Sequence, residues 1–132
     1  MRKTLTLLIP LALAGCETWG PTWSEVSGDR YYRTELNRGP TIVEHIDGKT
    51  PLPPGRNVAA RVEPGRHVIT LQGVPLRPGW SGWLQDFQLE MAPCMRYYVN
   101  AQYDGALVPS RWTPVVDYVE PIGGCELPGA AK

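Results

Sequence analysis

The side chains that could do chemistry are few in this chain and widely spaced. The segment Gly79–Trp83 reads Gly-Trp-Ser-Gly-Trp, so it has Trp where the Gly-x-Ser-x-Gly nucleophile motif ends in Gly. No strand-to-helix pattern surrounds Ser81. His67 follows a Pro-Gly turn, where a hydrogen-bonded structural role is favoured over that of a base. The sequence therefore predicts a protein that is not an enzyme.

Metal, cofactor and nucleic-acid sites are not expected either. His45 lies between Glu44 and Asp47, but a local strand and turn do not bring such residues together as zinc requires. The acidic pairs Glu44/Asp47 and Asp117/Glu120 are expected to be solvated turn and edge residues. The 13 Lys and Arg balance 13 Asp and Glu, and no basic run is present, which argues against phosphate-backbone binding.

The first sixteen residues have the pattern of an export signal. A basic start, Met1-Arg2-Lys3, precedes an apolar run over residues 4–14, which is shorter than the roughly 20 residues that cross a bilayer. The run ends in Leu13-Ala14-Gly15-Cys16, which resembles the bacterial lipobox. The resemblance implies that residues 1–15 are a cleaved lipoprotein signal peptide and that Cys16 is acylated, palmitate included. The alternative is an ordinary cleaved signal with a chance cysteine.

A lipobox also implies a location in the cell. Two or more acyl chains anchor a protein stably without spanning the membrane. Glu17, in place of Asp after the cysteine, favours the outer membrane, with the domain facing the periplasm. Residues 16–28 would then be the lipidated cysteine and a tether, and residues 29–132 the folded domain. Trp19 and Trp23 would either rest at the membrane interface or pack on the domain, and packing is favoured.

The other two cysteines, Cys94 and Cys125, are expected to pair. An oxidising compartment beyond the inner membrane permits a disulfide, which would tie the tail to the strand that starts at Met95. A metal-binding or catalytic pair is the alternative, but the chain has no Cys-x-x-Cys motif.

The chain is expected to be all-β. Its 14 Gly and 14 Pro are spread throughout, so helices of ordinary length do not fit between them. Alternating apolar residues instead predict a single antiparallel β-sandwich of about seven strands. These strands are expected at residues 30–36, 41–46, 58–62, 67–71, 83–91, 95–103 and 112–119.

Turn residues refine this arrangement. Asp47-Gly48 is a strong turn signal after the strand at 41–46. Glu63-Pro64-Gly65-Arg66 fits a type II turn, which would join the strands at 58–62 and 67–71 as a hairpin. Pro114 predicts that the last strand is an edge strand or carries a bulge.

The stretch over residues 41–71 resembles bacterial PEGA-type modules. These carry a strand that ends in Asp-Gly, as at Asp47-Gly48, then a spacer, then a Pro-Gly-x-His turn, as at Pro64–His67. The resemblance implies a small transthyretin-like or immunoglobulin-like sandwich that serves as an accessory module in the cell envelope. It implies no catalytic residue, and about 50 further residues follow Leu71.

The loop over residues 78–83 carries the two candidate contact residues, Trp80 and Trp83. Trp is enriched at binding hot spots, although Trp83 also fits the buried face of its strand and is expected to enter the core. The expected function is a non-catalytic binding or assembly-support module for another envelope component. The alternative is a glycan or peptidoglycan binder that uses exposed Trp and Tyr side chains.

Overall fold

The computed structural model of the chain describes residues 20–29, 36–54, 58–74, 83–105 and 111–129. Cys16, Trp19 and Trp80 lie outside these ranges, as does nearly all of the strand expected at residues 30–36. The described chain is all-β, without a helix. Its eight strands are β1 (Ser24–Ser27), β2 (Arg38–Gly39), β3 (Thr41–Ile46), β4 (Ala60–Val62), β5 (Gly65–Gly73), β6 (Leu84–Met91), β7 (Met95–Tyr103) and β8 (Trp112–Pro121).

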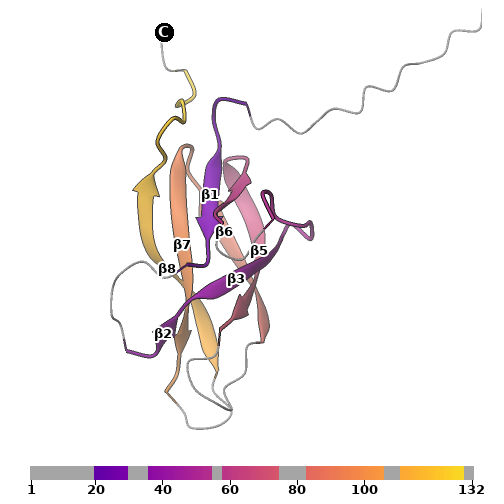
Figure 1. The fold of residues 1–132 in the computed structure, drawn as a ribbon, viewed down its shortest axis with the longest axis vertical. Coiled ribbons are helices and arrows are strands. Elements are labelled where there is room, and N and C mark those ends of the chain that lie inside the picture. Colours follow the sequence, from indigo (N-terminus) through magenta and orange to yellow (C-terminus); the bar gives the residue numbers. More distant parts are fainter. Residues whose placement is uncertain (1–19, 30–35, 55–57, 75–82, 106–110, 130–132) are drawn as a thin grey trace, which may run out of the picture.

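The strands form two sheets, as expected for a β-sandwich (Figure 1). The larger sheet has the order β2-β7-β1-β4, and its fifth strand, β8, also pairs with β7. The smaller sheet has the order β3-β5-β6. All pairs are antiparallel except β1 and β7, which are parallel. The expectation of a purely antiparallel sandwich is wrong at this pair, because β1 runs in the same direction as its neighbour β7.

The core lies between the inner faces of both sheets. Inward side chains alternate along each strand, as the sequence pattern predicts. They include Ile69 and Leu71 of β5, Leu89 and Met91 of β6, and Val99, Ala101 and Tyr103 of β7. Burial of the Tyr103 ring raises the pKa of its hydroxyl.

Trp83 is not in this core, contrary to expectation. β6 begins one residue later, at Leu84, and 48% of the Trp83 surface is exposed. Trp112, at the start of β8, is buried instead, and its Nε1–H donates to the Trp83 carbonyl at 3.2 Å. Gly73 makes room for it, because a Cβ there would lie 2.9 Å from the Trp112 indole. The core tryptophan therefore comes from a strand 29 residues away.

The expected hairpin around Pro64 is also wrong. β4 pairs with β1, whereas β5 pairs with β3 and β6 in the other sheet. Gly65 has φ +125°, far from the value near +80° of a type II turn, and the chain crosses between the sheets here. Alternation tells which face of each strand is apolar, and two such strands can face each other across the core as well as pair within one sheet.

Other turn expectations hold. Asp47 and Gly48 both have positive φ, and Ile46 and Lys49 exchange two backbone hydrogen bonds around them, as in a two-residue hairpin turn. β8 pairs only with β7 in the described chain, so Pro114 lies on an edge strand as predicted. Leu36 is exposed, so it does not have the buried place that the expected strand at 30–36 gave it.

The predicted Cys94–Cys125 disulfide is present, and both cysteines contact Trp23 just before β1. It therefore closes the end of the sandwich where β1 begins and β8 ends (Figure 1). The Cys94 N–H donates to the Trp23 carbonyl at 2.8 Å, and the Glu126 N–H donates to the Pro21 carbonyl at 2.9 Å. The tail therefore lies along residues 21–23 and is fastened to the β6–β7 turn. Residues 24–27, expected to belong to a tether, form the fully buried strand β1, so the folded body begins earlier than expected.

Replacing both Cys94 and Cys125 with Ser should lower the free energy of unfolding by about 3 kcal/mol, because the 31-residue separation leaves a long loop unclosed in the unfolded chain. Urea unfolding of the full chain in detergent measures this. Cys16→Ser is the matched control and should leave the midpoint unchanged. An unaltered midpoint and slope in the double variant would contradict a stabilising role for the bridge.

Candidate functional site

The outer face of the larger sheet is built around the carboxylate of Glu25 in β1. Glu25 is only 4% exposed, although it is charged and faces away from the core. Its Oε2 accepts from Arg96 Nε of β7 at 2.6 Å, and its Oε1 accepts from Trp23 Nε1 at 2.9 Å. Arg61 Nε of β4 lies 3.7 Å from the same carboxylate. One side chain thus joins β1 to both neighbouring strands.

Arg96 extends this network to β8. Its Nη1 donates to Glu120 Oε1 at 2.9 Å, and the Tyr98 hydroxyl donates to the same oxygen at 2.7 Å. Burial alone would lower the pKa of Arg96, but its hydrogen bonds to Glu25, Tyr98 and Glu120 raise it above the ordinary value. Burial and the bond to Glu120 raise the pKa of Tyr98. Arg96 is therefore a fixed cation between two carboxylates.

A second arginine crosses the same face. Arg38 Nε of β2 donates to Gln102 Oε1 of β7 at 3.0 Å, and Arg38 Nη1 donates to Asp117 Oδ1 of β8 at 2.6 Å. The Asp117 side chain is almost fully buried, at the bulge in β8. Asp117 and Glu120 were expected to be solvated, but they hold arginines, because the bulge turns Asp117 onto the outer face of the sheet.

Trp23 packs on the domain, as favoured by the sequence. The guanidinium carbon of Arg61 lies 4.7 Å from the centre of the Trp23 ring. A cation stacked on an aromatic face is held in place by the ring quadrupole. Trp23 therefore orients Arg61 as well as bonding to Glu25.

A cleft of about 360 Å³ opens beside this network. Its lining includes Glu25 and Ser27 of β1, both buried, and Arg61, Arg96 and Tyr98 of the two neighbouring strands. Asp29 and an apolar wall complete the lining, and this wall consists of Pro53, Val58 and Ala59.

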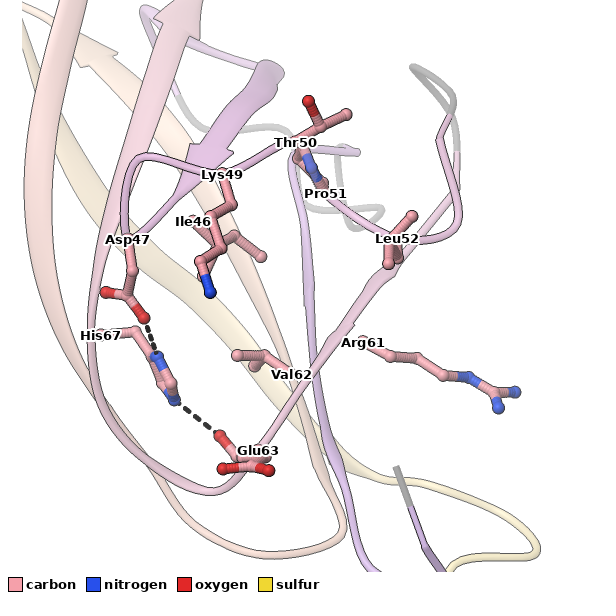
Figure 2. A pocket seen from close by; sticks show the side chains of 10 residues that line it. All are labelled: Ile46, Asp47, Lys49, Thr50, Pro51, Leu52, Arg61, Val62, Glu63 and His67. Atoms are coloured by element: carbon pink, nitrogen blue, oxygen red, sulfur yellow. Dashed lines mark hydrogen bonds and ion pairs between the residues drawn. The ribbon is translucent and has the colours of Figure 1, made fainter. Parts of the chain in front are cut away.

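A second pocket of about 280 Å³ lies where the Asp47-Gly48 turn meets the β4–β5 crossover (Figure 2). Here His67 Nδ1 lies 2.6 Å from Asp47 Oδ2, and His67 Nε2 lies 2.6 Å from the Glu63 carbonyl oxygen. Both partners are acceptors, so both bonds form together only when the ring carries two protons. His67 is hydrogen-bonded as predicted, and the Asp-Gly and Pro-Gly-x-His sequences meet at this contact.

Asp47 is held by more than His67. Its Oδ1 accepts from the Val68 N–H at 2.9 Å. The hydrogen bond to His67, followed by that to Val68, lowers the pKa of Asp47 below its ordinary value of 3.8. In Figure 2 the Arg61 side chain extends away from Asp47 and His67, and its Nε lies 3.7 Å from Glu25 Oε1. Arg61 lines both pockets, whereas Asp47 and His67 line only this one.

The sequence interpretation missed the site around Glu25. Glu25, Arg61, Arg96 and Glu120 each occupy the polar position of an alternating strand, which looks the same whether the side chain is solvated or paired. Their opposite charges suggest that they pair, but which carboxylate meets which arginine can be told only when the order of the strands is known. Of the two predicted contact residues, Trp83 lies at the opposite end of the sandwich from the disulfide, and Trp80 lies outside the described residues.

Comparison with known protein families, curated proteins and solved structures finds no match for this chain. Within the described ranges, no three His, Cys, Asp or Glu side chains gather as a metal site. The same ranges contain no helix long and apolar enough to span a membrane.

Glu25→Gln should lower the free energy of unfolding by about 3 kcal/mol, because Arg96 and Arg61 would lose the buried charge that they face. Glu90→Gln is the matched control. Glu90 pairs with Arg66 at 3.3 Å, but their side chains are 69% and 75% exposed, so this change should cost at most about 1 kcal/mol. Urea unfolding distinguishes the two, and equal losses would refute a special role for Glu25.

Asp47→Asn should cost about 1 kcal/mol of stability at neutral pH, because it weakens the contact with His67. Asp47 has a lowered pKa in the folded state, so its contribution is complete above pH 3.8 and is lost as the pH falls through the folded value. The wild type and the variant should therefore converge below pH 3.8 in unfolding experiments.

The control for this experiment is Glu44→Gln, which removes a carboxylate from β3, the strand that leads into the Asp47 turn. It should leave the difference between neutral and acidic pH as in the wild type. A gap between the wild type and Asp47→Asn that stays constant down to pH 2 would show that the Asp47 charge does not act through this bond.

Proposed function

We propose that this protein is a lipid-anchored lipoprotein of the bacterial outer membrane that binds another periplasmic envelope component without catalysing a reaction. The observation that carries the proposal is that the two ends of the sandwich differ in character. The chain enters β1 at the end of the sandwich that the disulfide closes, and Trp83, which precedes β6, is exposed at the other end.

The entry end suits an anchor. Trp23 is seven positions after Cys16, so Trp23 lies at most ~25 Å along the chain from an acylated cysteine. Trp23 and Pro21 are bonded to the disulfide-fastened tail, and β1 follows at once as a buried strand between β4 and β7. A force applied at the anchor would therefore act on β1, which is held within the larger sheet by β4 and β7. The disulfide agrees with an extracytoplasmic location, although it supports that location only weakly.

The opposite end suits a contact. β5 and β7 end there, and β6 and β8 begin there (Figure 1), and three exposed apolar side chains belong to this end, Leu36, Trp83 and Leu84. Aromatic residues are enriched at the centres of protein interfaces. A domain held at one end would present these side chains away from the membrane that carries it.

The bonding of the titratable groups supports a non-catalytic role. Both ring nitrogens of His67 are bonded within the protein, and the Glu25 carboxylate is shared by Trp23 and Arg96. A general base needs to reach a substrate proton, and neither group is placed to do so.

A photoreactive phenylalanine analogue in place of Trp83 should capture the partner in intact cells. The expected result is a discrete crosslinked band from the membrane fraction, identified by mass spectrometry. The same analogue at Leu127, which is exposed near the disulfide, is the matched control and should not give this band. Crosslinks to glycan strands alone would instead support the alternative of a peptidoglycan binder.

The anchor is tested in the same cells. Mass spectrometry should find acyl chains on Cys16, and Cys16→Ser should release the folded protein into the soluble periplasmic fraction. An unmodified Cys16 would refute the anchor, and equal capture from positions 83 and 127 would refute the proposed contact end. The two halves of the proposal can therefore fail separately.

A further inference from the structure

We infer that the cleft between Arg61, Arg96 and Asp29 binds a small zwitterionic ligand, an amino acid or a short peptide with a free carboxylate and a free ammonium group. This inference goes beyond the proposed function and does not depend on the anchor or on the contact at Trp83.

The cleft has the dimensions and the mixed lining of a small-molecule site. Its volume of about 360 Å³ falls within the range of roughly 300–1,000 Å³ that is usual for such pockets. Pro53, Val58 and Ala59 offer an apolar wall for a side chain. The Leu52 carbonyl accepts from the Arg61 N–H at 2.7 Å, which fixes the start of this wall against β4.

The two arginines would bind the carboxylate. Each guanidinium has five N–H groups. Arg96 uses some of these N–H groups to bond Glu25 and Glu120. The 3.7 Å contact between Arg61 and Glu25 is too long for a hydrogen bond, so it does not occupy an N–H group of Arg61. Both side chains are held in advance, Arg96 by two carboxylates and Arg61 by the Trp23 ring. A carboxylate matches the planar fork of an arginine and would find donors already oriented.

The charge of the site selects a zwitterion over a simple anion. Of the residues that line the cleft, Glu25 and Asp29 carry two negative charges, and Arg61 and Arg96 carry two positive ones. Glu120 lies outside the lining and adds a third negative charge next to Arg96. These carboxylates would repel a bare anion, whereas a ligand with its own ammonium group would offset the charge of its carboxylate.

Asp29 is the acceptor for that ammonium group. It lines the cleft, and its backbone is fixed on both sides. The Asp29 N–H donates to Ser27 Oγ at 3.1 Å, and the Asp29 carbonyl accepts from the buried Asn100 Nδ2 at 3.0 Å. The structure therefore holds acceptor and donors in one lining before any ligand arrives.

The pocket at His67 is a poorer candidate. Its volume of about 280 Å³ is below the usual range, and both nitrogens of its histidine are already bonded within the protein. It serves as an internal comparison, because a ligand that perturbs His67 instead of the cleft would contradict the assignment.

The test is a titration of the ¹⁵N-labelled full chain in detergent with the dipeptide Ala-Ala, followed by NMR. We expect amide shifts at Ser27, Ala59 and Tyr98. Acetyl-Ala-Ala lacks the ammonium group and Ala-Ala-amide lacks the carboxylate, and each should bind about tenfold or more weakly because one charged hydrogen bond is lost. Inorganic phosphate should bind more weakly than Ala-Ala.

Variants complete the test. Arg61→Gln should weaken Ala-Ala about tenfold, and Arg61 is half exposed, so the fold should tolerate the change. The matched control is Arg66→Gln, in an exposed arginine of β5 outside the cleft, which should bind like the wild type. The proposal is overturned if Ala-Ala causes no shifts in the cleft, if either analogue or phosphate binds as tightly, or if both variants lose affinity equally.

Discussion

The arrangement of the larger sheet depends on one buried carboxylate. Glu25 sits on the strand by which the chain enters the fold, and removing such a charge from water costs several kcal/mol unless it is paired. The pairing is supplied by Trp23 before the strand, Arg61 on one neighbour and Arg96 on the other. Since these three groups come from separate places in the chain, the charge is fully paired only when β1 is inserted between β4 and β7.

The disulfide reinforces the same insertion from the tail. Cys94 is the last residue before β7, and its N–H donates to the Trp23 carbonyl, so the bridge to Cys125 fixes three segments around the entry point. The parallel pairing of β1 with β7 makes this necessary. A parallel neighbour cannot be held by a short hairpin, and distant parts of the chain have to supply its contacts.

The alternation of apolar and polar residues predicts where most strands lie, but it does not show which strands pair with one another. The strands at Thr41–Ile46, Met95–Tyr103 and Trp112–Val119 follow from period-two patterns, and the disulfide follows from counting cysteines. β1 was missed because its four residues, Ser-Glu-Val-Ser, contain one apolar side chain. The crossover after Val62 was misassigned because a Pro-Gly turn fits a hairpin equally well, and the choice is made by which sheet each strand joins.

The edges of both sheets bear on how such a domain would meet a partner. β8 carries Pro114, which has no N–H to donate, and a bulge at Asp117, while β6 carries Asp86 and Glu90 along its length. Prolines, bulges and charges at edges discourage the addition of another strand. Addition of a strand at β8 or β6 is therefore disfavoured, and recognition at these two edges is left to side chains. The exposed Trp83 end and the cleft beside Arg61 are the described surfaces that offer oriented side chains for that purpose.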